Sequence, residues 1–201
     1  MDEQHFNMPT DVTTTKHYVF VADGYGNNRI AKFDRAGNYL GMWGGLKPGT
    51  DQGQFILPHS ITSLNDRLYV ADRGGGRIQV FDLDGEFLDA WENIIAPWGI
   101  ASFNDHIYVV GQTFGNGPYP TAQSAINYVL KSGAYTPAPV GQDLIIFNSD
   151  GKVVQEVSLP QGRDLGQVDW VHGVDVGSDG GVYIADVIGN HIQKWNAEKT
   201  Q

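Results

Sequence analysis

The fold is decided by Pro58-His59-Ser60-Ile61, followed by Arg67-Leu68-Tyr69-Val70-Ala71-Asp72 and then by Arg77-Ile78-Gln79-Val80-Phe81-Asp82. The two longer runs are rich in β-branched and aromatic residues, and Asn-Asp and Gly-Gly-Gly sequences bound them. Runs of this composition between such turn residues predict short antiparallel β-strands. We therefore expect this stretch to form one small antiparallel sheet.

The same pattern recurs along the chain. One copy begins at Pro9 and another at Pro58, and each reaches an Ala-Asp pair whose aspartate stands fourteen residues after the proline. Two further copies begin at Pro97 and Val171. Units of about 40 residues with three or four strands each are typical of β-propeller blades. The sequence therefore predicts one all-β domain over residues 1–201, a β-propeller with four blades in this chain. The repeats span about 9–57, 58–96, 97–170 and 171–201.

The third repeat carries an insertion at 111–141, which is rich in Gly, Pro, Ala and Tyr. A short helix is expected within it at 122–131, because Thr121 can cap its start and Gly133 follows its end. Two interpretations stay open: a lid or edge loop of a site, and a tolerated surface insertion.

Composition limits the partners. The chain has 13 basic and 23 acidic side chains, so its formal net charge is −10 at pH 7. This argues against nucleic acid and anionic membranes, which are bound through clustered Lys and Arg. The absence of Cys excludes disulfides, Cys-ligated zinc and thiol nucleophiles. The first residues lack the basic and apolar regions of an export signal, and no apolar run reaches the ~18 residues of a membrane span. These features assign no compartment.

Positions that differ between repeats are free to serve a site, because shared positions mostly serve the blade. At the second position of each repeat, directly after the proline or the residue that takes its place, the four repeats have Thr10, His59, Trp98 and His172. Equivalent positions two blades apart in a six-bladed ring lie about 120° around the axis. His59 and His172 would then point into the channel as two arms of a trigonal metal site. The alternative is that each is a satisfied core or channel histidine.

Two further exceptions follow the recurring aspartates, which we assign to hydrogen bonding with turn backbone. Directly after the aspartate, repeats one, two and four have Gly24, Arg73 and Val187. At the next position they have Tyr25, Gly74 and Ile188. In an antiparallel blade the loop after the second strand lies beside the entrance to the first strand. We therefore expect Tyr25 and Arg73 on the same face as His59 and His172. The alternative for each is a solvated loop side chain.

The motifs shared with a known family are His5-Phe6 before Pro9-Thr10-Asp11-Val12, Asp23-Gly24-Tyr25 with Asn28-Arg29-Ile30, Gly53-Gln54-Phe55 before Pro58-His59-Ser60, Val70-Ala71-Asp72-Arg73 with Gly76-Arg77-Ile78-Gln79, and His172 with Val182-Tyr183-Ile184. With them the chain resembles NHL-repeat propellers and, more narrowly, the peptidylglycine α-hydroxyglycine amidating lyases, which are often secreted. The resemblance covers nearly the whole chain but only the last four blades of a six-bladed family. We therefore expect an incomplete ring, whose exposed apolar blade face and strand edge favour self-association.

The resemblance implies a lyase that splits a small peptidyl α-hydroxyglycine substrate into a peptide amide and glyoxylate at a channel zinc. His59 and His172 are then zinc ligands, Tyr25 is the base and Arg73 assists electrostatically. A free phenol, with a pKa of ~10, is only about 0.1% ionised at pH 7, and a nearby zinc and arginine would lower that pKa. The family's third zinc histidine falls in the absent blades. Gly173 stands where the family has a calcium-binding aspartate, which argues against the structural calcium.

Two functions from different classes stay open. The first is an amidating-lyase-type enzyme, truncated here and weak or inactive alone. The second is a non-catalytic NHL binding platform for a peptide or protein. Tyr25, Arg73 and the paired histidines favour the enzyme, whereas the missing ligand favours the platform. A nucleophilic hydrolase lacks support, because the chain has no Gly-x-Ser-x-Gly motif.

Overall fold

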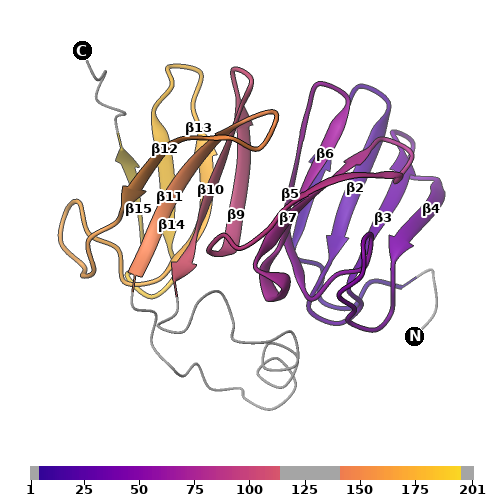
Figure 1. Ribbon diagram of the computed structural model, residues 1–201, viewed down its shortest axis with the longest axis horizontal. Helices are drawn as coiled ribbons and strands as arrows, with labels where there is room; N and C mark the ends of the chain where they lie inside the picture. Colours follow the sequence, from indigo (N-terminus) through magenta and orange to yellow (C-terminus); the bar gives the residue numbers. More distant parts are fainter. Residues whose placement is uncertain (1–4, 114–140, 196–201) are drawn as a thin grey trace.

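The computed structural model of the protein describes residues 5–113 and 141–195. These residues form fifteen β-strands and one short 3-10 helix, and the strands assemble into four antiparallel sheets (Figure 1). Each sheet is made of strands that follow one another in the chain, with β4 at the right of the figure and β15 at the left. The expected all-β propeller with four blades is confirmed.

We number the blades in chain order. Blade 1 contains β1 (Asp11–Thr14), β2 (Tyr18–Asp23), β3 (Arg29–Asp34) and β4 (Tyr39–Gly44). Blade 2 contains β5 (Pro58–Leu64), β6 (Arg67–Asp72), β7 (Arg77–Asp82) and β8 (Phe87–Trp91), with the 3-10 helix η1 (Arg73–Gly75) between β6 and β7. Blade 3 contains β9 (Ala96–Phe103), β10 (His106–Thr113), β11 (Gly141–Asn148) and β12 (Val153–Ser158). Blade 4 contains β13 (Val171–Val176), β14 (Val182–Asp186) and β15 (His191–Trp195).

Turn chemistry explains the tight hairpins between the first and second strands of blades 2 and 3. Asn65 and Asp66 have φ of 51° and 57°, and Asn104 and Asp105 have φ of 45° and 59°. Two successive left-handed residues suit a two-residue hairpin whose twist matches that of its strands, and Asn and Asp tolerate this conformation. The Asn-Asp pairs of the sequence thus set the register of β5 with β6 and of β9 with β10.

The core consists of three hydrophobic clusters, one between each pair of successive blades. Side chains on neighbouring strand positions point to opposite faces. In β6, Leu68 joins the cluster shared with blade 1, whereas Tyr69 joins the cluster shared with blade 3. A third cluster, which includes Val110 and Ile184, joins blades 3 and 4. Apolar burial between sheet faces therefore holds the blades together.

The first strands of the four blades, β1, β5, β9 and β13, line a central cavity of about 460 Å³. Hydroxyl groups tie these strands to one another. Ser60 Oγ donates a hydrogen bond to Asp11 Oδ2 at 2.5 Å and accepts one from the backbone N–H of Ile100 at 3.2 Å. Ser60 therefore links three blades to one another.

The insertion is shorter than the sequence indicates. β10 continues to Thr113 and β11 begins at Gly141, so residues 111–113 and Gly141 pair in the sheet of blade 3. The pairing of β10 with β11 includes Gln112 with Gln142 and continues to Thr113 with Gly141. The connection at 114–140, including the helix expected at 122–131, lies outside the described residues. Among the residues the structure describes, no helix has the length and apolar character needed to cross a membrane.

Candidate active site at one end of the channel

His59 is the second residue of β5 and is only 4% exposed. Its Nδ1 lies 2.6 Å from the carbonyl oxygen of Trp98. A carbonyl oxygen only accepts hydrogen bonds, so Nδ1 carries the proton and Nε2 of the neutral ring keeps its lone pair. The Tyr25 hydroxyl, 3.1 Å from Nε2, donates to that lone pair. Tyr25 belongs to blade 1, so this contact crosses a blade boundary.

His172 approaches His59 from two blades away. It is the second residue of β13, and the centroids of the two imidazole rings are 4.8 Å apart with the rings inclined at 76°. Trp98 in β9 packs beside both histidines, with its ring centroid 4.8 Å from that of each, so the three rings form a triangle. The residues of one repeat slot in blades 2, 3 and 4 thus meet at the end of the channel.

Arg73 packs over the ring of Trp98. It begins η1, is 3% exposed, and holds its guanidinium carbon 3.5 Å from the centroid of the Trp98 ring. This is the geometry of a desolvated cation–π contact. Within the described part of the chain, the Arg73 Nε and Nη2 groups have no hydrogen-bond partner. Buried polar groups are rarely left without partners, so these donors are available to a ligand anion.

Local backbone chemistry holds Tyr25 and Arg73 in place. The loops between the second and third strands of blades 1, 2 and 4 end on a left-handed residue: Asn28 (φ 55°), Gly76 (φ 62°) and Asn190 (φ 56°). Gly24, beside Tyr25, packs so closely on blade 2 that an added Cβ would collide with the Pro58 carbonyl group. An added Cβ at Gly74, beside Arg73, would likewise collide with the Ile56 carbonyl oxygen, so the loops of blades 1 and 2 lie tightly against neighbouring backbone.

Burial keeps both histidines neutral. Desolvation, followed by the electrostatic effects of His172 and Arg73, lowers the pKa of His59 from 6.5 to about 3. Desolvation also lowers the pKa of His172, followed by the charge of Arg73. Both rings are therefore neutral at pH 7. Neutral imidazoles are the form that binds metal ions, and a ring with so low a pKa is a weak proton acceptor.

The two imidazoles fit a metal ion. When two histidines bind one tetrahedral zinc at about 2.0–2.1 Å, their ring centroids lie about 5 Å apart. The observed separation is 4.8 Å. Metal-binding histidines also commonly donate their second N–H to a backbone carbonyl, as His59 does to Trp98. The described ranges contain no group of three or more His, Cys, Asp or Glu side chains placed to hold a metal.

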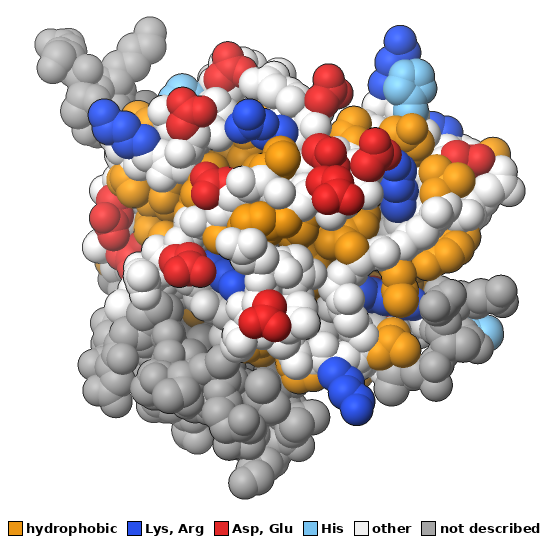
Figure 2. All heavy atoms as spheres, turned by 45° about the vertical axis from the view of Figure 1, so that its right-hand side comes forward, with side chains coloured by type: hydrophobic (Ala, Val, Ile, Leu, Met, Phe, Trp, Pro, Cys, Tyr) orange, Lys and Arg blue, Asp and Glu red, His pale blue; other side chains and the backbone are white. Residues whose placement is uncertain are grey.

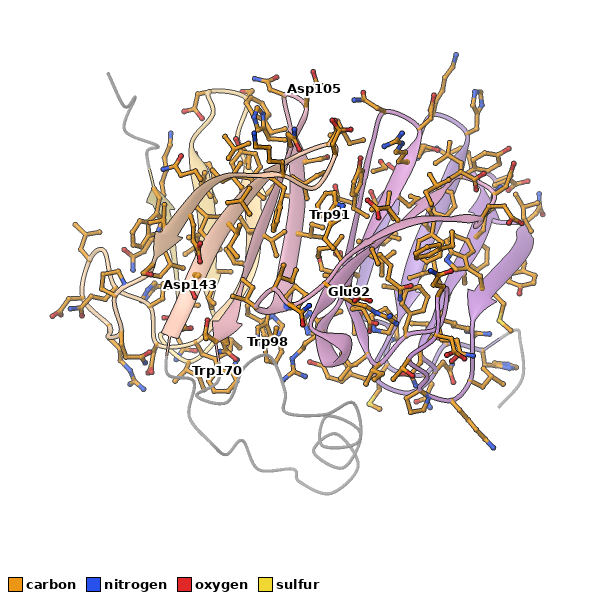
Figure 3. All side chains as sticks on the ribbon, in the orientation of Figure 1. Trp91, Glu92, Trp98, Asp105, Asp143 and Trp170 are labelled. Atoms are coloured by element: carbon orange, nitrogen blue, oxygen red, sulfur yellow. The ribbon has the colours of Figure 1, made fainter. Side chains whose placement is uncertain are left out.

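The structure brings together all four residues singled out from the sequence, Tyr25, His59, Arg73 and His172, while their chemical roles stay predictions. Sequence reasoning missed the central place of Trp98, although the repeat slot that contains both histidines also contains this residue. Its Nε1 donates to Gln112 Oε1 at 2.8 Å, which fixes the indole. Figure 3 shows Trp98 and Trp170 at one end of the molecule and Asp105 at the opposite end.

Comparisons with known proteins agree with the repeat pattern. The NHL repeat model matches residues 55–81, in blade 2. The chain is 31% identical over 208 residues to peptidyl-glycine alpha-amidating monooxygenase B of Xenopus laevis, which covers 100% of this chain and 22% of that protein. It is 41% identical over 83 residues to a probable peptidyl-alpha-hydroxyglycine alpha-amidating lyase of Caenorhabditis elegans, covering 40% of this chain and 24% of that protein. It is also 40% identical over 88 residues to mouse NHL repeat-containing protein 3, covering 43% of this chain and 25% of that protein.

The chain thus spans about a fifth of the length of the first two curated relatives that it matches, 22% and 18%. Among solved structures, a streptogramin B lyase gives a TM-score of 0.59 at 15% identity, over 94% of this chain and 51% of that chain. The computationally designed protein Ika4 gives 0.55 at 12% identity, over 97% and 94% of the two chains. At these identities the likeness concerns the fold alone.

Proposed function

We propose, from the premise that this chain belongs to the NHL-repeat β-propellers, that it carries the catalytic face of a lyase that splits a peptidyl α-hydroxyglycine into a peptide amide and glyoxylate. The observation that carries the proposal is the Tyr25 hydroxyl, 3.1 Å from His59 Nε2, with the His172 ring centroid 4.8 Å from that of His59. The similarity to proteins named for peptide amidation supports the choice of reaction.

The reaction needs a base, an acid and a site for one carboxylate. The substrate hydroxyl loses its proton, its oxygen becomes the aldehyde oxygen of glyoxylate, and the bond between the α-carbon and the amide nitrogen breaks. The nitrogen takes up one proton and leaves as the peptide amide. Atoms balance without an added reactant, so the chain only has to position the substrate, move one proton and stabilise charge.

Tyr25 is the residue that we assign to the proton transfer. Its hydroxyl is held at the mouth of the channel by the close packing of Gly24 on blade 2. His59 is a poor alternative, because a ring with a pKa of about 3 holds a proton only weakly. In its ionised form the Tyr25 oxygen accepts the substrate proton, and it can then return that proton to the leaving nitrogen.

Arg73 is the residue that we assign to the carboxylate of the substrate. Its Nε and Nη2 groups are buried and have no partner among the described residues. An arginine with two donors available can bind a carboxylate through two parallel hydrogen bonds. Its stacking on Trp98 fixes the plane of the guanidinium, at 3.5 Å from the ring centroid. This arrangement favours a substrate that ends in a free α-carboxylate.

His59 and His172 are the residues that would hold a zinc ion, through neutral rings that are already close to one another. Zinc on His59 Nε2 would displace the hydrogen bond that the Tyr25 hydroxyl donates to this nitrogen and would leave that hydroxyl beside the ion. When bound, zinc polarises a hydroxyl group and stabilises the negative charge that develops on its oxygen. The His59 N–H bond to the Trp98 carbonyl orients the ring for this role at 2.6 Å. Two imidazoles leave the ion under-coordinated, so we expect weak binding by this chain alone.

The second candidate is a non-catalytic NHL platform that binds a peptide or protein on the same face. It is favoured by the fact that no third metal ligand joins the two histidines within the described residues. The similarity to NHL repeat-containing protein 3 over 88 residues is compatible with it. On this reading Arg73 binds a carboxylate, and no bond in the ligand is broken.

One experiment separates the two candidates. The 201-residue chain is loaded with zinc, its metal content is determined, and glyoxylate release from a small N-acyl-α-hydroxyglycine is followed. If the chain is a lyase, glyoxylate is released, and the release depends on both Tyr25 and the metal. Ligand binding without glyoxylate, unchanged by Tyr25→Phe, would establish the platform and reject the lyase.

A further inference from the structure

Gln112 takes the place in blade 3 that Arg73 takes in blade 2. In blade 2 the residue before Arg73 pairs with Pro58, and in blade 3 the residue before Gln112 pairs with Pro97 in the same way. Equivalent positions of neighbouring antiparallel blades lie at the same end of the propeller. The end of β10 therefore places a second polar side chain at the end of the molecule that carries the candidate site.

Gln112 and Arg73 both contact Trp98. The guanidinium carbon of Arg73 lies 3.5 Å from the centroid of the indole ring, and the indole N–H donates to Gln112 Oε1 at 2.8 Å. An indole N–H only donates hydrogen bonds, so it faces the oxygen of the amide and leaves the nitrogen over. This nitrogen, Gln112 Nε2, is buried and has no hydrogen-bond partner among the described residues. Buried amide donors rarely lack a partner.

The neighbouring glutamine shows that burial alone does not leave such a donor over. Gln142 pairs with Gln112 across β10 and β11 and is also buried. Its Nε2 donates to the carbonyl oxygen of Val168 at 3.0 Å, and its Oε1 accepts from the backbone N–H of Val171 at 2.6 Å. Both ends of the Gln142 amide are therefore used, whereas Gln112 has one donor that lacks an acceptor.

The groups left over around Trp98 are all donors. They are Nε and Nη2 of Arg73 and Nε2 of Gln112, because the one acceptor of the Gln112 amide is already bonded to Trp98. The net charge of −10 works against anions in general, and Figure 2 shows acidic groups spread over one face of the molecule. Buried donors beside a fixed positive charge can outweigh this effect for an anion that they contact directly.

We propose that Gln112 Nε2 binds the carboxylate of the substrate together with Arg73. This inference rests on the proposed function, which assigns that carboxylate to Arg73. Arg73 supplies the charge, and Gln112 supplies a neutral donor at the edge of the same indole ring. Gln112 then determines specificity, because a ligand that ends in a carboxamide brings N–H groups that these donors cannot accept.

The test compares two unreactive ligands, N-acetylglycine and N-acetylglycinamide, which differ only in the carboxylate. Their dissociation constants are measured by calorimetry at pH 8 on the chain freed of metal with EDTA, so that no metal binds the carboxylate. Gln112→Glu keeps an oxygen for the Trp98 N–H but replaces the donor by a negatively charged acceptor. We expect the affinity for N-acetylglycine to fall by about 10- to 100-fold, as for loss of a hydrogen bond to a charged group, and the preference over the amide to be lost. Gln155→Glu is the control, because it adds the same charge at an exposed position of β12 in the same blade.

A second variant, Gln112→Met, fills similar space without a donor and serves if the buried glutamate prevents folding, which circular dichroism shows. It should also weaken N-acetylglycine more than N-acetylglycinamide, because a charged acceptor loses more with the donor than a neutral one. A role of Gln112 through Trp98 alone would weaken both ligands alike, and an unchanged ratio of the two dissociation constants would overturn the proposal. No binding of N-acetylglycine by the unsubstituted chain would overturn it too. If N-acetylglycine binds in a way that depends on Gln112 and no glyoxylate is released from the hydroxylated substrate, the lyase is rejected and the carboxylate site is kept.

Discussion

The hydroxyl group of Tyr25 lies 3.1 Å from Nε2 of His59, although the two residues belong to different blades. A loop of blade 1 thus supplies the hydrogen-bond partner of a histidine in blade 2. Close packing at Gly24 permits the contact, because any side chain at that position would strike the Pro58 carbonyl. The candidate site is therefore a property of the junction between blades 1 and 2 and not of a single repeat.

The Tyr25→Phe variant tests the proton transfer. The aromatic ring can keep its place, so we expect unchanged thermal unfolding and unchanged metal content. Loss of the base should lower the rate of glyoxylate release by about 10² to 10⁴, the range typical of general acid–base groups. Tyr39→Phe is the matched control, since Tyr39 is 40% exposed in β4. Equal rates for the two variants would remove Tyr25 from the mechanism.

Replacing both histidines, His59→Asn together with His172→Asn, tests the metal site. We expect zinc bound per chain, measured by atomic emission after dialysis against limiting zinc, to fall to background. Either single variant should bind less zinc than the unsubstituted protein, because each removes one of two neutral imidazoles. His106→Asn serves as the control, because His106 lies in the hairpin at the end of the blade opposite the site. Zinc content that survives the double change would exclude these histidines as ligands.

The repeat pattern was sufficient to predict the blades, because strand alternation and turn residues are local properties of the sequence. It also indicated the candidate site, because His59 and Arg73 break a repeat whose other positions serve packing. A comparison of equivalent positions in the repeats shows which residues depart from the pattern. The antiparallel order of the strands then places these residues at the same end of the blades.

What the sequence could not provide is the role of Trp98. A tryptophan in a repeat slot is indistinguishable from a core residue until three blades are assembled around it. The limits of the insertion could not be predicted either, since the ladder of blade 3 extends through Gly111 and Gly141, a residue type that is depleted in strands. Tertiary pairing, and not local preference, decides where those strands end.

Gly24→Ala tests how the junction positions Tyr25. The added methyl group would collide with the Pro58 carbonyl and with Thr10, so blade 1 has to shift away from blade 2. We expect a loss of about 1–3 kcal/mol in the free energy of unfolding, as for other overpacked sites, and weaker catalysis. Gly141→Ala is the control, because the nearest atom to its added Cβ is 3.8 Å away. Equal stability of the two variants would contradict the close approach.

The low pKa of His59 predicts a pH dependence of stability. The ordinary pKa of a histidine is 6.5 and that of His59 in the folded chain is about 3, so between these values the unfolded chain binds a proton that the folded chain does not. Folding stability attributable to His59 is therefore complete above pH 6.5 and is lost progressively as the pH falls toward 3. At pH 4.5 the loss amounts to about 3 kcal/mol, at about 1.4 kcal/mol for each pH unit.

Urea unfolding in the presence of EDTA, at pH 7.0 and pH 4.5, measures this effect. The difference in unfolding free energy between the two pH values should be smaller in His59→Gln than in the unsubstituted chain by about 3 kcal/mol. His106→Gln is the matched control for removal of a histidine ring, because His106 lies in the hairpin of blade 3 and its Nδ1 bonds the Asn104 carbonyl there. If His59→Gln and the unsubstituted chain lost stability equally on acidification, the histidine would be protonated in the fold, and neither its neutrality nor its readiness to bind a metal could be maintained.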